Sequence, residues 1–195
     1  MRARSHASWD AIVQGALALW RTKGFAETTV TDICKAAGVS KALFYVYFAR
    51  KEDVLMEIEI FTMRDAHLAA RSVASRPYEL LDLVEAVIGV LEQGMRRFPP
   101  DLVFEAVIET YRMERRALAE GAAEAGLTFL FLEPFEQAQR DGKLPQATDL
   151  AQAARIAQIL VADAIRTWSA LLYKDPLAAP LAAQIAALLA TRPAE

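Results

Sequence analysis

The sequence predicts an all-α protein with about nine helices, a small N-terminal unit of three helices and a larger helical C-terminal part. Apolar residues recur at helical spacing and no stretch alternates as a strand would. The 195 residues include only 8 glycines and 8 prolines. Hydrophobic residues make up 54% of the chain, which is enough for a substantial core and favours a further interface between chains.

The most informative stretch covers residues 29–51 and is typical of two short helices joined at a sharp corner. Thr29 and Asp32 have the spacing of a capping box at the start of the first helix. Gly38 can form the corner, because a residue without Cβ takes the left-handed conformation cheaply. Ser40 is a good N-cap for the second helix. A plain helical hairpin inside an all-α core is the alternative interpretation.

The second helix of this motif, over residues 41–48, suits double-stranded DNA. In a helix-turn-helix this helix lies in the major groove with its N-terminal residues at the base edges. Lys41 can reach a base or a phosphate, Tyr45 can offer a hydroxyl, and Lys51 can add a charge for the DNA backbone. The candidate DNA-binding residues are Thr29, Ser40, Lys41, Ala42, Leu43, Tyr45, Tyr47 and Lys51.

Residues 24–53 resemble the N-terminal domain of the tetracycline-repressor-like (TetR) family of transcriptional regulators. The matching pieces are Gly24-Phe25, Thr28-Thr29-Val30, Asp32-Ile33, Ala37-Gly38-Val39-Ser40-Lys41, Phe44-Tyr45, Tyr47-Phe48 and Lys51-Glu52. Leu43 and Val46 stand where this family usually has polar residues, and Cys34 replaces the usual alanine. The resemblance implies a DNA-binding domain over residues 1–53 and a helical effector-binding and dimerisation domain over residues 54–195.

The charge distribution agrees with DNA binding at the N-terminal end. Residues 1–53 hold 8 basic against 5 acidic side chains, a net charge of +3, whereas the rest of the chain carries −6. A positive end attracts the phosphate backbone, and an acidic body turns away from it.

Helices are also expected before and directly after the motif. An apolar stripe that starts at Trp9 predicts a helix over residues 8–23, which Gly24 ends. Residues 1–7, with two arginines, are expected to form a loose basic arm or a frayed terminus. A long helix over residues 51–75 is expected to link the motif to the rest of the chain.

End signals divide the remaining chain into further helices. Pro77 suits a first helical position, and the run Phe98-Pro99-Pro100 is a clear break. Pro134 should kink or restart a helix, and Thr148 can cap the next one. The predicted helices span residues 77–97, 101–116 and 149–174, with a last one from residue 175 or 180 to 191. Between them, the apolar run 127–135 belongs to a helical stretch that Asp141-Gly142 is expected to end.

The last two helices are rich in small and apolar residues and suit a self-complementary four-helix interface about a two-fold axis. A dimer would place two reading helices on a palindromic operator, with half-sites one helical turn or a multiple apart. A buried hairpin within one chain is the alternative. The candidate interface residues are Ile156, Ile159, Leu160, Asp163, Thr167, Ile185 and Leu188.

The sequence offers no support for catalysis, a metal or a cofactor. Its two histidines, His6 and His67, are far apart, and Cys34 is the single cysteine. Neither a glycine-rich phosphate loop nor a nucleophile elbow is present. No apolar run is long enough for a membrane span and the N-terminus lacks an apolar signal segment, so a cytoplasmic protein is expected.

The family resemblance implies a small-molecule cavity within the C-terminal helices. Its aromatic candidates favour an apolar or aromatic effector, although simple core is the favoured interpretation of each candidate taken alone. The candidates are Met95, Phe98, Phe104, Tyr111, Phe129, Phe131 and Trp168.

The sequence therefore predicts a dimeric, sequence-specific regulator of transcription, which in the resembling family is usually a repressor released by an effector. One alternative is a helical protein-interaction module with a vestigial helix-turn-helix, which the apolar Leu43 and Val46 favour. The other is an enzyme of helical fold.

Overall fold

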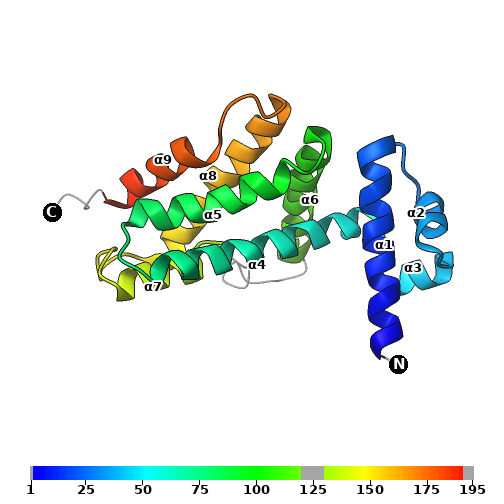
Figure 1. The fold of residues 1–195 in the computed structure, drawn as a ribbon, viewed down its shortest axis with the longest axis horizontal. Coiled ribbons are helices and arrows are strands. Elements are labelled where there is room, and N and C mark those ends of the chain that lie inside the picture. Colours follow the sequence, from blue (N-terminus) through cyan, green and yellow to red (C-terminus); the bar gives the residue numbers. More distant parts are fainter. Residues whose placement is uncertain (1, 120–129, 191–195) are drawn as a thin grey trace.

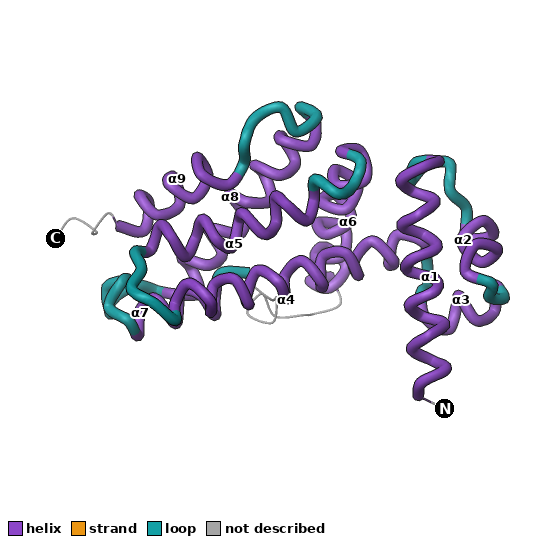
Figure 2. The backbone as a smooth tube through the Cα atoms, viewed as in Figure 1, coloured by secondary structure: helices purple, strands orange, loops and turns teal. Residues whose placement is uncertain are grey.

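The computed structural model of the chain describes residues 2–119 and 130–190, with the side chains of 2–5 and 56–63 left aside, and confirms the all-α class (Figures 1 and 2). The described residues contain no strand. The helices are α1 Arg2–Lys23, α2 Val30–Ala37, α3 Lys41–Tyr47, the 3-10 turn η1 Lys51–Val54, α4 Leu55–Ala74, α5 Leu80–Met95, α6 Pro100–Ala119, α7 Leu132–Arg140, α8 Leu150–Ala170 and α9 Ala178–Ala190.

The helices form two groups that α4 connects. Helices α1, α2 and α3 stand together at one end of the molecule, and α4 runs from them into the larger group (Figure 1). There α5 packs against both α4 and α9, while α6 packs against α8.

Each group has its own hydrophobic core, and the two cores meet. The C-terminal core is built from α4, α5, α6, α7, α8 and α9. The N-terminal core contains Trp20, Ile33 and Phe44, but also Leu102 of α6, which is 2% exposed. Phe98 packs against both cores. The N-terminal core therefore extends beyond residue 53.

Several helix starts differ from the sequence-based predictions, among them those of α1 and α5. Helix α1 begins at Arg2, so the loose arm predicted for residues 1–7 is wrong from Arg2 onward; the stretch contains no glycine or proline that would stop the helix. Helix α5 begins at Leu80 rather than Pro77, because Glu79 is extended and its N–H donates to Asp82 over 2.8 Å in a capping box.

Helix α7 begins at Leu132, inside the predicted apolar run 127–135, of which residues 127–129 lie outside the described residues. It ends at Arg140, directly before Asp141-Gly142, as predicted. Pro134 lies in the first turn of α7, where its missing N–H breaks no helical hydrogen bond. Asp149, rather than the predicted Thr148, caps α8 by accepting from the Gln152 N–H over 3.1 Å.

The connection between α8 and α9 is set by two unusual features. Helix α8 ends at Ala170, before the predicted residue 174, because Leu172 and Tyr173 take left-handed φ angles of 58° and 59° that side-chain-bearing residues rarely adopt. Helix α9 then begins at Ala178, where the Glu92 carboxylate of α5 accepts from the Ala178 N–H over 2.8 Å.

Within the described residues, none of the helices combines the length and the apolarity that crossing a membrane requires.

Candidate nucleic-acid interface

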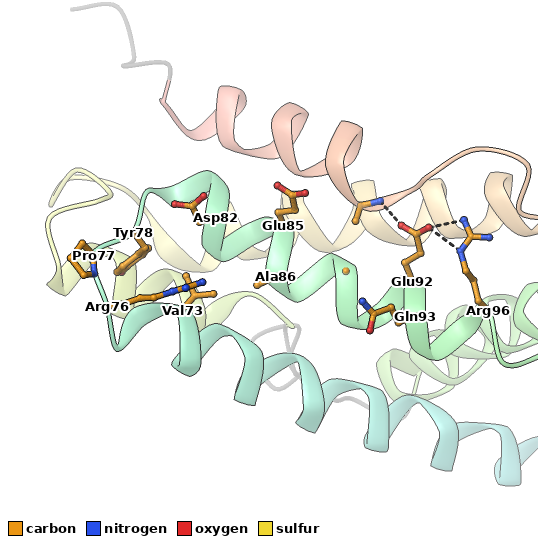
Figure 3. A pocket seen from close by; sticks show the side chains of 12 residues that line it. Val73, Arg76, Pro77, Tyr78, Asp82, Glu85, Ala86, Glu92, Gln93 and Arg96 are labelled. Atoms are coloured by element: carbon orange, nitrogen blue, oxygen red, sulfur yellow. Dashed lines mark hydrogen bonds and ion pairs between the residues drawn. The ribbon is translucent and has the colours of Figure 1, made fainter.

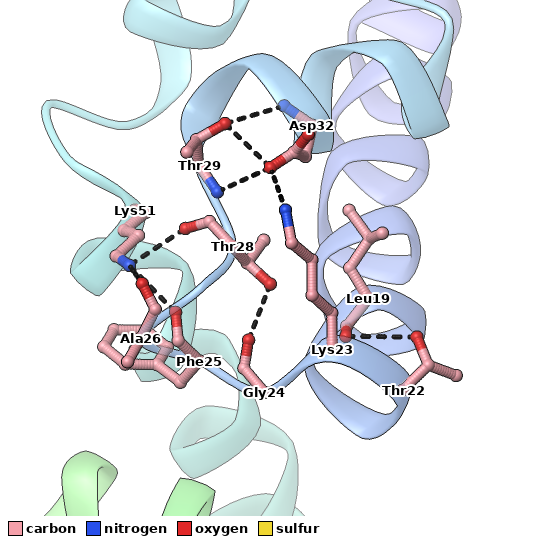
Figure 4. Close-up of polar contacts among 10 residues, drawn as sticks. All are labelled: Leu19, Thr22, Lys23, Gly24, Phe25, Ala26, Thr28, Thr29, Asp32 and Lys51. Atoms are coloured by element: carbon pink, nitrogen blue, oxygen red, sulfur yellow. Dashed lines mark hydrogen bonds and ion pairs between the residues drawn. The ribbon is translucent and has the colours of Figure 1, made fainter.

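The capping box predicted at the start of α2 is present. The Thr29 hydroxyl accepts from the Asp32 N–H over 3.2 Å, and the Asp32 carboxylate accepts from the Thr29 N–H over 3.0 Å (Figure 4). Lys23 at the end of α1 donates to the same carboxylate over 2.8 Å. The Lys23 ammonium and the two Thr29 donors hold the pKa of Asp32 far below its ordinary value. The start of α2 is thus tied to α1.

Gly38 forms the corner between α2 and α3, as predicted. Its φ of 66° and ψ of 30° lie in the left-handed region. The Val39 N–H donates back to the backbone carbonyl oxygen of Cys34 over 3.0 Å. The Ser40 hydroxyl then caps α3 by accepting from the Leu43 N–H over 3.1 Å. Cap, corner and second cap follow one another within twelve residues, so local chemistry determines the angle between the two helices.

Helix α3 buries one side and presents the other to solvent. Phe44 and Phe48 are 0% and 4% exposed, and they anchor α3 in the N-terminal core. Lys41 and Ala42 are exposed, and the Tyr45 side chain is 55% exposed. Tyr47 and Leu43 are half-buried.

Val46 is a surface residue of α3 that the sequence analysis did not include among the DNA contacts. It is 74% exposed, which is unusual for a valine. Helical spacing could have predicted this exposure, because Val46 lies four positions after the exposed Ala42 and therefore on the same side of the helix. An apolar side chain on such a helix suits the methyl group of thymine.

The Lys51 ammonium, predicted to face the DNA backbone, is instead engaged within the protein. It donates to the carbonyl oxygens of Phe25 and Thr28 over 2.9 Å each and to that of Ala26 over 3.3 Å (Figure 4). It also lies 4.4 Å from the centre of the Phe25 ring. Lys51 thus holds the loop between α1 and α2 against the segment after α3.

Two of the residues predicted for the effector cavity lie in the C-terminal core, and two more pack against it. Phe131 is fully buried and stacks on Phe135 with ring centres 5.2 Å apart. Trp168 is 5% exposed and its indole N–H donates to the Asp175 carbonyl over 2.7 Å. Tyr111 is 45% exposed. Met95, Phe98 and Phe104 are half-buried, and Phe129 lies outside the described residues.

The cavities that the described residues form include two lined by other residues. The larger, about 730 Å³, is a groove along α5 between the end of α4 and the start of α9, lined by charged side chains such as Asp82, Glu85 and Arg96 (Figure 3). The smaller, about 290 Å³, lies between α4 and α7 at His67 and Glu133. Neither is lined by any of the seven predicted residues, so the aromatic effector site stays a prediction.

The residues predicted for the dimer interface fall mostly on one exposed stripe. On α8, Ile156 and Ile159 are 42% and 54% exposed, and Leu188 of α9 is 50% exposed. Leu160 is half-buried and Asp163 and Thr167 are exposed on the same stripe. Ile185 is 1% exposed in the core of its own chain, which corrects its assignment to an interface.

Among the residues that the structure describes, no three His, Cys, Asp or Glu side chains come together as a metal site.

A family model described as bacterial regulatory proteins, tetR family, matches residues 12–58. The HTH-type transcriptional regulator EthR of Mycolicibacterium smegmatis is 48% identical over 48 residues, which are 25% of this chain and 22% of that protein. EthR of Mycobacterium tuberculosis is 34% identical over 67 residues, 34% of this chain and 31% of that protein. The matches thus span less than a third of these relatives' own lengths.

Solved structures resemble the chain over nearly its whole length. The FadR of Thermus thermophilus, a TetR-family transcriptional repressor in complex with lauroyl-CoA, superposes with a TM-score of 0.72 at 25% identity, over 95% of this chain and 97% of that one. The FadR of Bacillus subtilis in complex with stearoyl-CoA superposes with a TM-score of 0.58 at 17% identity, over 93% and 97%. The second likeness concerns the fold alone.

Proposed function

We propose that this member of the tetR family of bacterial regulatory proteins binds a palindromic operator as a homodimer and represses transcription until a small effector releases it. One observation carries the proposal: the corner at Gly38 holds α3 with Phe44 buried and Tyr45 exposed. Such a helix can enter the major groove while its other side stays in the core.

The proposed DNA contacts lie on the exposed side of α3. Lys41 and Ser40 are at its N-terminal end, where the helix dipole and free N–H groups favour phosphate. Tyr45 supports a hydroxyl contact, and Ala42 and Val46 support contact with thymine methyls. Lys51, whose ammonium is engaged with three carbonyl oxygens, acts by positioning the segment after α3.

A homodimer explains the apolar surface of the last two long helices. Ile156 and Ile159 on α8 and Leu188 on α9 are apolar side chains with about half of their surface exposed. Burying them against a second copy removes that surface from water. Helix α3 has only seven residues and reads few base pairs, so two copies on one palindrome provide the affinity that one copy lacks.

The effector is proposed to be apolar, and a long acyl chain is the first class to test. The T. thermophilus FadR, whose fold resembles this chain at 25% identity, is in complex with lauroyl-CoA. An effector acts by binding more tightly to a conformer whose two α3 helices no longer match successive grooves. The aromatic side chains of the C-terminal core, such as Phe131 and Trp168, are proposed to contact the acyl chain of the effector.

The test is a binding titration on the DNA upstream of the protein's own gene. Lys41→Ala and Tyr45→Ala should each weaken specific binding by about tenfold, because each removes a groove contact. The control is Lys174→Ala in the α8–α9 turn, which removes an exposed lysine far from α3 in the sequence. Wild-type affinity of both α3 variants overturns the contact assignment.

A helical protein-interaction module with a vestigial helix-turn-helix is the second candidate, and the exposed Val46 favours it. The same titration separates the two functions. Specific binding that weakens steeply with salt requires phosphate contacts and eliminates the interaction module.

A further inference from the structure

Glu109 of α6 is a buried carboxylate with three arginine partners. Its side chain is 1% exposed. Oε1 accepts from Arg116 over 2.8 Å and from Arg50 over 2.9 Å, and Oε2 accepts from Arg112 over 3.3 Å. A buried charge is tolerated in a protein only when it is paired and hydrogen-bonded, as this one is.

Only one of these three partners comes from outside α6. Arg112 and Arg116 lie on the same helix as Glu109, whereas Arg50 lies 59 positions earlier in the chain. Arg50 follows the end of α3 by three residues and precedes η1, where it also pairs with Asp53 over 2.8 Å. The Arg50–Glu109 pair therefore joins the segment after the reading helix to the C-terminal body.

The charges of this cluster keep the pair formed at neutral pH. Burial raises the pKa of Glu109, but hydrogen bonds from Arg116, Arg50 and Arg112 outweigh burial and leave the pKa below its ordinary value. The carboxylate is thus ionised throughout the neutral range. Without this negative charge, the guanidinium of Arg50 would face two like charges on α6, which repel it.

Other contacts join α1 and the N-terminal core to the start of α6. Leu102 is buried in the N-terminal core, and the Arg21 guanidinium of α1 lies 4.9 Å from the centre of the Phe98 ring. These contacts hold the start of α6 against the N-terminal core, to which Phe44 of α3 also belongs. The Arg50–Glu109 pair adds a polar contact between α6 and the segment that directly follows α3.

We propose that Glu109 is a positioning residue for DNA binding, which fixes the orientation of α3 relative to the body through Arg50. In a dimer this contact sets how the two α3 helices face successive major grooves. The inference rests on the proposed function, because it assigns to a residue outside the helix-turn-helix a part in reading the operator.

The test compares Arg50→Gln with Arg116→Gln. The two arginines donate to the same Glu109 oxygen, and their side chains are 41% and 40% exposed, so each substitution removes one ion pair with Glu109. Arg50→Gln also removes the ion pair with Asp53, which Glu109→Gln leaves in place. Of the two substitutions, only Arg50→Gln removes an ion pair between α6 and the segment after α3. Affinity for the full palindrome should fall by about tenfold in Arg50→Gln and by less than about twofold in Arg116→Gln, while binding to a single half-site stays similar in both.

Two further variants separate positioning from direct contact. Glu109 carries no positive charge that could contact a phosphate, so weaker binding by Glu109→Gln cannot come from a lost DNA contact. Glu109→Gln should weaken binding to the palindrome as much as Arg50→Gln does. The double variant should be no weaker than either single one, because both remove the same contact. The dependence of affinity on salt should keep its slope in all variants. A slope reduced by about one in Arg50→Gln shows a direct phosphate contact and overturns the proposal.

Hydrogen exchange on the DNA-free dimer gives a result that does not depend on operator binding. Backbone amides of α3 should exchange faster in Arg50→Gln than in the wild type, and at the wild-type rate in Arg116→Gln. Equal exchange in both variants overturns the proposed positioning role. Absence of specific DNA binding by the wild type overturns the proposed function instead, and the exchange result still decides the role of Glu109 in fixing α3.

Discussion

The Lys51 Nζ lies 2.9 Å from the carbonyl oxygen of Thr28, 23 positions earlier in the chain. This contact closes the loop between α1 and α2 against the segment that follows α3. A side chain that sequence patterns assign to DNA therefore connects the loop before α2 to the segment after α3, next to the surface proposed to face DNA.

Replacing Lys51 by methionine should lower the free energy of unfolding by about 2 kcal/mol, because three carbonyl oxygens lose a charged donor while the aliphatic stem remains. Denaturant unfolding measures this value. Lys41→Met is the matched control and should leave stability unchanged, since Lys41 is exposed and has none of these carbonyl contacts. An unchanged stability of Lys51→Met would contradict the positioning role.

The left-handed conformation of Gly38 predicts a backbone penalty for larger residues. Gly38→Ala should cost about 1–2 kcal/mol, because a Cβ in this conformation approaches the following carbonyl oxygen. Gly38→Asn should cost less, since asparagine tolerates the left-handed region better. Thermal unfolding of the two variants checks this order, and a stability of Gly38→Ala equal to that of the wild type would remove the corner argument.

Two helical glycines should respond in opposite directions to substitution. A Cβ on Gly15 of α1 would lie 3.3 Å from the Ala37 nitrogen of α2, whereas a Cβ on Gly89 of α5 would meet nothing within 4 Å. Gly15→Val should therefore destabilise the protein by about 1–3 kcal/mol through overpacking. Gly89→Ala should stabilise it by about 0.5–1 kcal/mol through backbone entropy. Urea unfolding decides both, and the same sign in both variants would refute the close approach of α1 and α2.

The lowered pKa of Asp32 predicts that its contribution to the stability of the fold depends on pH and is lost at low pH. A carboxyl whose pKa is depressed in the folded state stabilises the fold above its ordinary value of 3.8 and loses this effect as the pH falls through the folded pKa. The thermal midpoint of Asp32→Asn should thus lie below that of the wild type at pH 7. The difference should shrink below about pH 4. A difference that stays constant with pH would show that the charge of Asp32 is not responsible.

The proposed dimer can be tested with two equally exposed apolar residues. Ile159 of α8 is 54% exposed and Leu68 of α4 is 55% exposed. Ile159→Glu should convert the dimer to a monomer, because a charge would be buried in the interface, and should abolish cooperative binding to the palindrome. Leu68→Glu should leave the dimer intact. Sedimentation measures the mass, and a dimeric Ile159→Glu variant would place the interface elsewhere.

Features that depend on neighbouring residues were predictable from the sequence, and features that depend on distant residues were not. Thr29, Gly38 and Ser40 act within four positions of themselves, so the two caps and the corner could be inferred. The start of α9 could not, because the Glu92 carboxylate that accepts from its first N–H groups comes from 86 positions earlier.

The surface of the candidate site was predictable in part for the same reason. The spacing of Phe44 and Phe48 shows which side of α3 is buried and leaves Tyr45 exposed. Helical spacing alone could not show that Ile185 of α9 is buried in the C-terminal core, or that Glu109 pairs with Arg50. Both facts follow from how helices pack, which depends on the whole chain.

Phe98 and Leu102 connect the two hydrophobic cores, and this has a consequence for any attempt to transplant the DNA-binding end. A fragment that stops at residue 53 lacks Val54, Leu55 and Leu102, all of which complete its interior. Such a fragment would expose apolar side chains to water and would be poorly soluble. A functional graft onto another protein must therefore carry a replacement for the first turn of α6.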